Sequence, residues 1–66
     1  MNTEDPLYEL AKEIILRDRK SSASFLQRRL RIGYFAAARI IDMLEENGIV
    51  GEANGTKPRE ILIPKP

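Results

Sequence analysis

The sequence predicts a small α+β domain, mostly helical, of the winged helix-turn-helix class: helix, short strand, helix, helix and a two-stranded wing. Two observations carry this prediction. Between residues 22 and 47, two apolar repeats of helical period are separated by a glycine, which is the pattern of a helix-turn-helix. From residue 49 onward the apolar period changes from 3.6 to 2 around an Asn-Gly pair, which indicates a hairpin.

The first helix is expected to begin at Asp5-Pro6, with Asp5 as N-cap, and to end near Asp18. Its apolar positions follow the 3.6-residue period and form one stripe: Leu7, Leu10, Ala11, Ile14 and Ile15. We therefore expect this helix to cover a small core. The 66 residues divide into a linker or cloning remnant (1–4), one domain (5–63) and a tail (64–66).

The second helix follows a polar loop that could include a strand of two or three residues at 21–23. Ser24 with Gln27 three residues later is a capping-box pattern, which predicts a helix start near Ser24. Leu26 and Leu30 are four residues apart and share one face. Gly33 is expected to supply the turn, since glycine adopts a positive φ without strain.

The third helix should run from about Tyr34 to Asn47, where Asn-Gly provides a stop. Its buried stripe is predicted to be Ala37, Ile40, Ile41 and Leu44. The opposite face then presents Phe35, Arg39, Asp42 and Glu46, flanked by Ala36 and Met43. A helix in this position of a helix-turn-helix can enter the major groove of DNA.

The remaining residues are expected to form the wing. Residues 49–50 read as a short strand, 52–56 as a turn and 60–63 as the returning strand. Pro58 lies on the approach to that strand, where a missing N–H does least harm.

The composition excludes several kinds of chemistry. The chain has no cysteine and no histidine, so it offers neither a disulfide framework nor the usual zinc ligands and imidazole bases. No phosphate-binding glycine motif is present. No apolar run is long enough to cross a membrane, and no secretory leader is evident. We therefore expect no enzyme activity, no metal, no cofactor and no membrane contact.

The net charge of +1 hides a segregated distribution. Residues 17–39 carry seven basic side chains against one acidic one, whereas both flanking segments are net negative. Such a block concentrates positive potential on one face, which favours a nucleic-acid partner over a surface of scattered arginines.

Residues near the start of the third helix are the predicted base contacts: Phe35, Ala36 and Arg39. Arg39 can bond guanine O6 and N7, or can instead pair with Asp42 on its own helix. Phe35 can contact a thymine methyl group, or can instead lie in the core under the wing. Contacts to the DNA backbone, which fix position rather than read sequence, are expected from Arg28, Arg29, Arg31, Tyr34, Lys57 and Arg59, with Arg19 and Lys20 as weaker candidates.

Three segments, LQRRLRIGY, AARIIDMLEENGIVG and GTKPREIL, resemble the gamma domain at the C-terminus of FtsK/SpoIIIE-type DNA translocases. The resemblance covers about residues 5–63. It implies a winged helix that binds short, G-rich, polar motifs in duplex DNA and orients loading of a hexameric motor toward the chromosome terminus. It also implies contact with the XerD recombinase, several copies side by side on DNA, and a parent protein anchored in the inner membrane at the septum, with this domain on the cytoplasmic side.

The sequence departs from the family at one place. Family members commonly carry Asn or Thr and then a basic residue where this chain has Phe35 and Ala36. The family's polar base contacts at these two positions therefore do not carry over. The resemblance still implies DNA contacts by Arg39 on the third helix and by Lys57 and Arg59 on the wing. Two other functions stay open: a winged helix used for protein contact, which an exposed Phe35 and Met43 would favour, and a free-standing transcription regulator.

Overall fold

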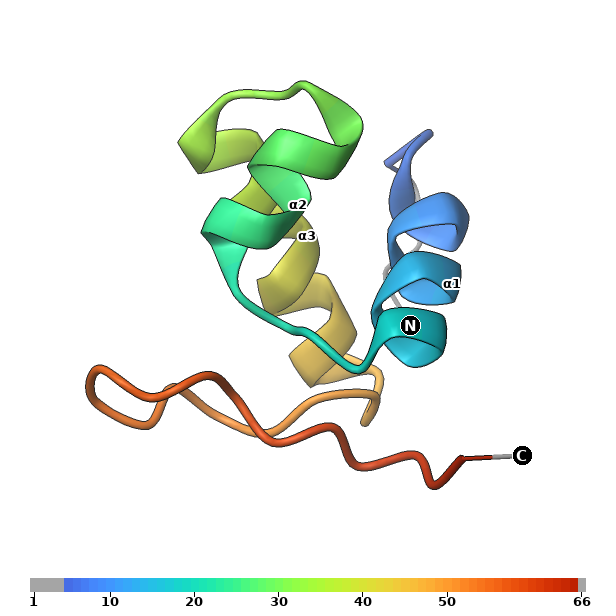
Figure 1. Cartoon of the computed structure of the whole chain (residues 1–66), viewed down its shortest axis with the longest axis vertical. Helices are drawn as coiled ribbons and strands as arrows, with labels where there is room; N and C mark the ends of the chain where they lie inside the picture. Colours follow the sequence, from blue (N-terminus) through green and yellow to red (C-terminus); the bar gives the residue numbers. More distant parts are fainter. Residues whose placement is uncertain (1–4, 66) are drawn as a thin grey trace.

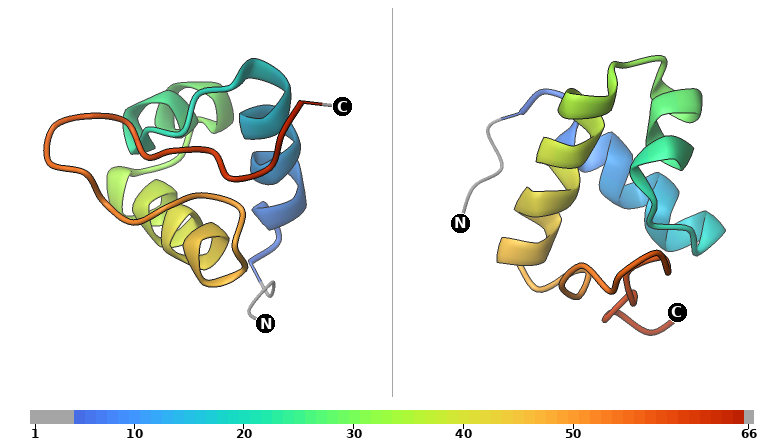
Figure 2. Two further views of the ribbon diagram at one scale, coloured as in Figure 1. Left: turned by 90° about the horizontal axis from the view of Figure 1, so that it is seen from below. Right: turned by 90° about the vertical axis from the view of Figure 1, so that its left-hand side faces the viewer.

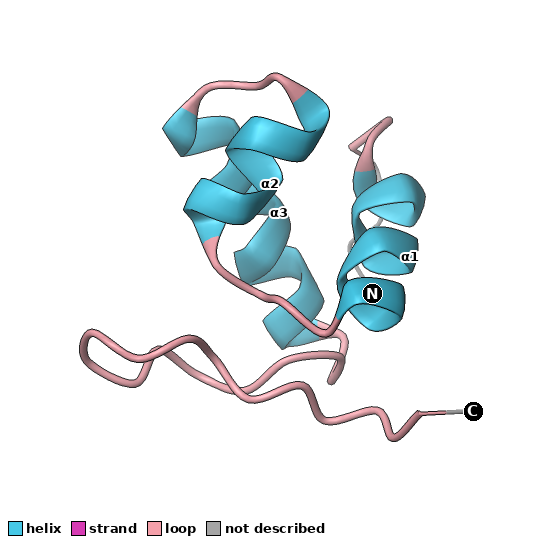
Figure 3. Cartoon of the chain, viewed as in Figure 1, coloured by secondary structure: helices cyan, strands magenta, loops and turns pink. Residues whose placement is uncertain are grey.

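The computed structural model describes residues 5–65, which form three helices followed by a long C-terminal loop (Figures 1 and 3). The helices are α1 (Tyr8–Asp18), α2 (Ala23–Leu30) and α3 (Tyr34–Glu46). α2 and α1 each pack against α3. The prediction of a small, mostly helical domain is confirmed. The predicted linker at 1–4 and the last residue of the predicted tail lie outside the described residues.

The chain enters α1 through a turn built on Asp5. The Asp5 side chain accepts a hydrogen bond of 2.9 Å from the Leu7 amide, and its carbonyl accepts one of 3.0 Å from the Tyr8 amide. An aspartate that bonds its own backbone two residues on favours a turn over a helix. The predicted N-cap at Asp5 is therefore wrong, and the helix begins at Tyr8. It ends at Asp18 as predicted, closed by Arg19 with a φ of 58°.

The buried face of α1 differs from the predicted stripe at one position. Leu10 is 46% exposed, whereas Tyr8 is 2% exposed and belongs to the core. The Tyr8 hydroxyl accepts a hydrogen bond of 2.8 Å from Asn47 Nδ2, just beyond the end of α3. Because a buried tyrosine hydroxyl needs a partner, this bond lets the ring replace Leu10 on the inner face.

α2 begins one residue after Ser22, and the capping box predicted at Ser24 is wrong. The Ser22 hydroxyl accepts a hydrogen bond of 3.1 Å from the Phe25 amide, which makes Ser22 the N-cap. Residues 21–23 accordingly form no strand. Leu26 and Phe25 are buried in the core, and Leu30 packs against it in a partly buried position.

In the turn between α2 and α3, the residue with the left-handed backbone conformation is an arginine. Arg31 has a φ of 54°, and its amide bonds the Gln27 carbonyl to close α2. Gly33 has a φ of −71° and serves as the N-cap of α3. The expectation that Gly33 supplies a positive φ is wrong.

The predicted stripe of α3 is confirmed. Its four residues, Ala37, Ile40, Ile41 and Leu44, are buried. Met43 is buried too, contrary to prediction. The buried side of α3 is broad because it meets α1, α2 and the first residues of the loop, Ile49 and Val50, which also join the core. Gly48 takes the left-handed conformation after the helix, with a φ of 77°.

The segment 49–63, called here the C-terminal loop, doubles back on itself without forming strands in the described chain. Two isolated antiparallel bridges join Val50 to Ile61 and Asn54 to Lys57. Gly55 occupies the reversal with a φ of 61°, as the Asn-Gly signal predicted. The two-stranded wing is therefore seen only as a loosely paired loop. Pro58 lies between Lys57 and Ile61, the returning-arm residues of the two bridges, and has no amide hydrogen to donate there.

The C-terminal loop lies across the lower ends of the helices (Figure 2). Its tip projects on the side of α2 and α3, and its returning arm passes toward α1 (Figures 1 and 2). Within residues 5–65, none of the three helices is long and apolar enough to cross a membrane.

Candidate nucleic-acid interface

The first turn of α3 exposes an aromatic pair. Phe35 is 86% exposed and Tyr34 57%, and their rings meet edge to face with centroids 6.0 Å apart. Phe35 is therefore not a core residue under the loop. Ala36, the third predicted base contact, is exposed beside them.

The N-terminus of α3 has positive character. Its N-cap, Gly33, makes no side-chain cap, and its first turn contains no acidic residue. The amide hydrogens of a first helical turn have no partner within the helix, and the macrodipole adds a partial positive charge there. This end of the helix is suited to approach an anionic surface.

Arg39 is exposed one turn further along α3. The alternative in which it pairs with Asp42 is not observed, because Asp42 Oδ1 instead accepts a bond of 3.3 Å from Arg59 Nη2. No carboxylate among residues 5–65 forms an ion pair with Arg39. The N–H donors of its guanidinium are therefore available to bond a partner.

Arg59, predicted as a backbone contact, holds the C-terminal loop to α3. Its guanidinium bonds Glu45 at 2.7 Å as well as Asp42, and its side chain is only 20% exposed. Its carbonyl accepts a hydrogen bond of 2.6 Å from Ser21 Oγ. These contacts give Arg59 a structural role and leave it poorly placed to meet a phosphate.

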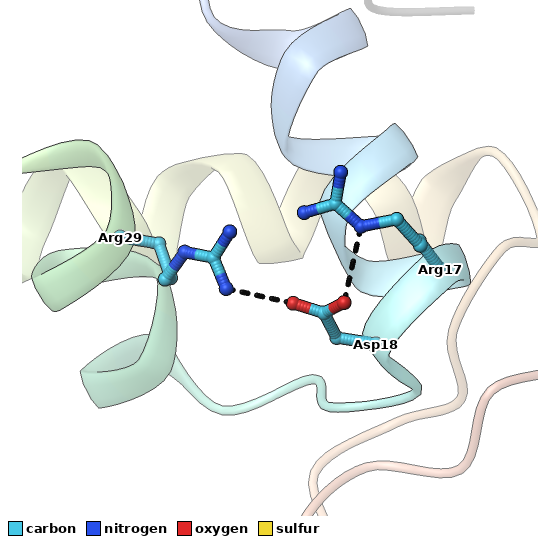
Figure 4. Close-up of polar contacts among 3 residues, drawn as sticks. All are labelled: Arg17, Asp18 and Arg29. Carbon is cyan, nitrogen blue, oxygen red and sulfur yellow. Dashed lines mark hydrogen bonds and ion pairs between the residues drawn. The ribbon is translucent and has the colours of Figure 1, made fainter.

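Arg29 is also engaged within the protein. It bonds Asp18 at 2.8 Å, and Arg17 bonds the other oxygen of the same carboxylate at 3.1 Å (Figure 4). The hydrogen bond from Arg17, together with the charges of both arginines, lowers the pKa of the Asp18 carboxyl below its ordinary 3.8. The Arg29 guanidinium also lies 5.7 Å from the centre of the Phe25 ring.

The other predicted backbone contacts are available. Arg28, Arg31 and Lys57 are exposed and form no ion pair within residues 5–65. They come from three different segments: α2, the turn before α3, and the tip of the C-terminal loop. Of the two weaker candidates, Lys20 is exposed and lies 5.9 Å from the Phe25 ring centre, while Arg19 is partly buried.

A groove of about 380 Å³ runs between these segments. Its walls are the start of α2, the inner edge of α3 and the tip of the C-terminal loop, with Ser22, Ser24, Tyr34, Ala38 and Lys57 among its lining residues. Sequence reasoning named Tyr34 and Lys57 but not the serines, whose position depends on how α2 is capped.

The family model described as the Ftsk gamma domain matches residues 2–64 of this chain. The DNA translocase FtsK of Borreliella burgdorferi is 56% identical over 61 residues, and the DNA translocase SpoIIIE of Bacillus subtilis is 54% identical over 61 residues. Each of these alignments covers 92% of this chain. The DNA translocase FtsK of Streptococcus pyogenes serotype M1 is 53% identical over 58 residues, or 88% of the chain. The chain spans only 7–8% of the length of these relatives.

Proposed function

Because the chain belongs to the FtsK gamma domain family, as its motifs predicted, we propose that it binds duplex DNA and reads sequence with α3. The chain is a gamma domain and not the ATPase motor part of such a translocase. In this proposal α2 and α3 act as a helix-turn-helix, and the C-terminal loop acts as its wing. The relatives are named DNA translocases. A domain that selects DNA sites would be useful to such proteins.

The observation that carries the proposal is the state of Arg39. It is exposed on α3 and forms no ion pair with the described carboxylates, although Asp42 lies one turn away on the same helix. The carboxylate of Asp42 instead pairs with Arg59. A free guanidinium near the start of a recognition helix is well suited to bidentate bonding with guanine.

The exposed cations around α3 would hold the domain in register. Arg28, Arg31 and Lys57 lie in the three segments that surround the groove or the start of α3, and phosphate contacts of this kind carry no sequence information. Tyr34 can add a hydroxyl bond to a phosphate. Arg29 and Arg59 are not among the proposed phosphate contacts, because both form ion pairs inside the protein.

The finer roles rest on the resemblance to the family. We propose that this domain selects a short, G-rich, polar motif, that several copies act together on DNA, and that its contact orients motor loading and translocation toward the chromosome terminus. Contact with the XerD recombinase and membrane anchoring of the parent protein at the septum belong to the same proposal. The proposed role in orienting translocation is tested by the symmetry of the selected DNA motif. The motif should be asymmetric, since a palindrome could not impose a direction of translocation.

A second function, contact with a protein partner, is favoured by one observation. Phe35 is almost fully exposed, and aromatic residues are enriched at protein interfaces. The buried position of Met43 removes the other residue that favoured this function.

The experiment that tests DNA binding is a salt titration on a random-sequence duplex. If three or four cations neutralise phosphates, log K should fall with log salt at a slope of about −3 to −4. Lys57→Ala should make that slope shallower by about one, whereas Lys65→Ala, two residues beyond the C-terminal loop, should leave it unchanged. An affinity that does not change between low and physiological salt would contradict the proposal.

A further inference from the structure

We propose that Phe35 contacts the 5-methyl group of a thymine in the major groove, beside the guanine bonded by Arg39. The inference rests on the proposed DNA binding and adds to it the class of base that this chain reads. It assigns a role to the exposed aromatic residue in the first turn of α3.

The ring of Phe35 is presented outward from the first turn of α3. Phe35 is the second residue of α3 and is 86% exposed. Its ring and that of Tyr34 meet edge to face, with an interplanar angle of 78°. A phenyl ring offers no hydrogen-bond donor, so it cannot read the polar edge of guanine or adenine. The one apolar group that a base pair displays in the major groove is the thymine methyl.

Its surroundings favour DNA over a protein partner. The exposed cations Arg31 and Arg39 flank the ring in sequence, and the uncapped helix N-terminus adds partial positive charge. A stable protein interface buries about 800 Å² on each partner around a predominantly apolar core. A single phenyl ring among cations fits a groove lined by phosphates better than it fits an apolar protein surface.

Ala36 is consistent with the same partner. It is exposed beside Phe35 and presents only a methyl group, so it adds no polar contact and leaves room for the helix to approach the bases.

The spacing fixes where the thymine should lie. Phe35 and Arg39 are four residues apart and therefore share one face of α3. The rise between them is about 6 Å, and successive bases along one strand are about 3.4 Å apart. The thymine should therefore lie within about two base pairs of the guanine.

The test compares thymine with deoxyuridine, which pairs identically but lacks the methyl group. A binding selection from random duplexes should enrich a site with a T within two base pairs of a G. Replacing each thymine of that site in turn by deoxyuridine should weaken binding about fourfold at one position, the loss expected for one buried methyl group. Phe35→Ala should bind the thymine and deoxyuridine sites equally, and Phe35→Leu should restore part of the difference.

Leu62→Ala, which removes another exposed apolar side chain, is the control and should keep the fourfold difference. The inference is overturned if the parent protein binds both sites equally, if the selected site contains no such thymine, or if Phe35→Ala keeps the full difference. Loss of a protein partner by Phe35→Ala with unchanged DNA binding would also overturn it. Failure of the proposed function is distinguished from these results, because the parent protein would then bind no duplex at all.

Discussion

The hydroxyl of Ser21 donates a hydrogen bond of 2.6 Å to the backbone carbonyl of Arg59, 38 residues further along the chain. Ser21 is 2% exposed. The side chain of Arg59 meanwhile reaches Glu45 and Asp42 on α3. One residue thus ties the C-terminal loop both to the connection between α1 and α2 and to α3. Since Lys57 lies two residues before Arg59, these bonds also position the cation at the tip of the loop.

Replacing Ser21 by alanine should destabilise the domain. The substitution leaves the Arg59 carbonyl without its partner in a partly buried position, and an unsatisfied buried group costs about 1–3 kcal/mol. Ser24→Ala removes the hydroxyl of an exposed serine in the first turn of α2 and should change stability by less than about 0.5 kcal/mol. Urea unfolding of both variants measures the difference, and equal midpoints would contradict the role given to Ser21.

Leu44→Ala tests the assignment of the inner face of α3. Leu44 has no exposed surface, and truncating a buried leucine costs about 2–5 kcal/mol. Leu10→Ala makes the same chemical change on α1 at a half-exposed position and should cost much less. In a domain this small the first substitution could unfold the chain. If the two variants melt at the same temperature in circular dichroism, the core described here is incorrect.

Asp18 should contribute stability that is lost in acid. Its pKa is lowered in the folded chain, first by the hydrogen bond from Arg17, so protonation favours the unfolded state. The contribution is present above the ordinary value of 3.8 and disappears as the pH falls through the lower folded value. Thermal melts of the parent and Asp18→Asn should therefore differ near neutral pH and converge in strong acid. Because the pair is at the surface, the difference should be small and should shrink in high salt. A gap that widens toward low pH would show that the sign is wrong.

The sequence predicted the helices well because their signals are local. The stripe of α3 from Ala37 to Leu44 recurs at helical spacing, and all of it is buried. The errors occurred where two residues two positions apart could each fulfil a role. Ser22 and Ser24 are both good N-caps, and in the structure it is Ser22 that accepts the hydrogen bond from the Phe25 amide. Likewise Tyr8, rather than Leu10, occupies the buried face of α1, because the hydroxyl of Tyr8 has a hydrogen-bond partner 39 residues away.

For the interface, the sequence identified the basic residues but not their partners. Arg39 and Arg59 are the same residue type, so the sequence alone does not distinguish their roles. In the structure Arg39 forms no ion pair with the described residues, whereas Arg59 pairs with two carboxylates. The decisive contacts join α3 to the C-terminal loop over 14 and 17 residues, which no helical spacing rule covers. The exposure of Phe35 was one of two open alternatives, and the structure decides it.

Replacing Phe35 and Ala36 by polar residues should change the preferred DNA. Phe35→Asn with Ala36→Arg replaces an apolar surface by two groups able to bond the polar edges of bases, since Asn pairs with adenine and Arg with guanine. Repeating the binding selection with this double variant should enrich a more G-rich motif, with less preference for thymine. If the parent and the double variant enrich the same motif, these two positions do not contact bases.

The central claim is that Arg39 reads bases while the surrounding cations only hold DNA. Binding isotherms at one salt concentration, on the selected site and on a scrambled duplex, test it for three variants. Lys57→Ala should weaken both duplexes by similar factors, because a phosphate contact carries no sequence information. Arg39→Lys keeps the charge but loses the bidentate geometry, so it should lose affinity mainly on the selected site.

Arg39→Ala is the most direct of these measurements. On a selected site that contains guanine it should lose about 1–3 kcal/mol of binding free energy, and on the scrambled duplex much less. Equal losses on the two duplexes would show that Arg39 contributes only charge, and would contradict the assignment of α3 as the helix that reads sequence.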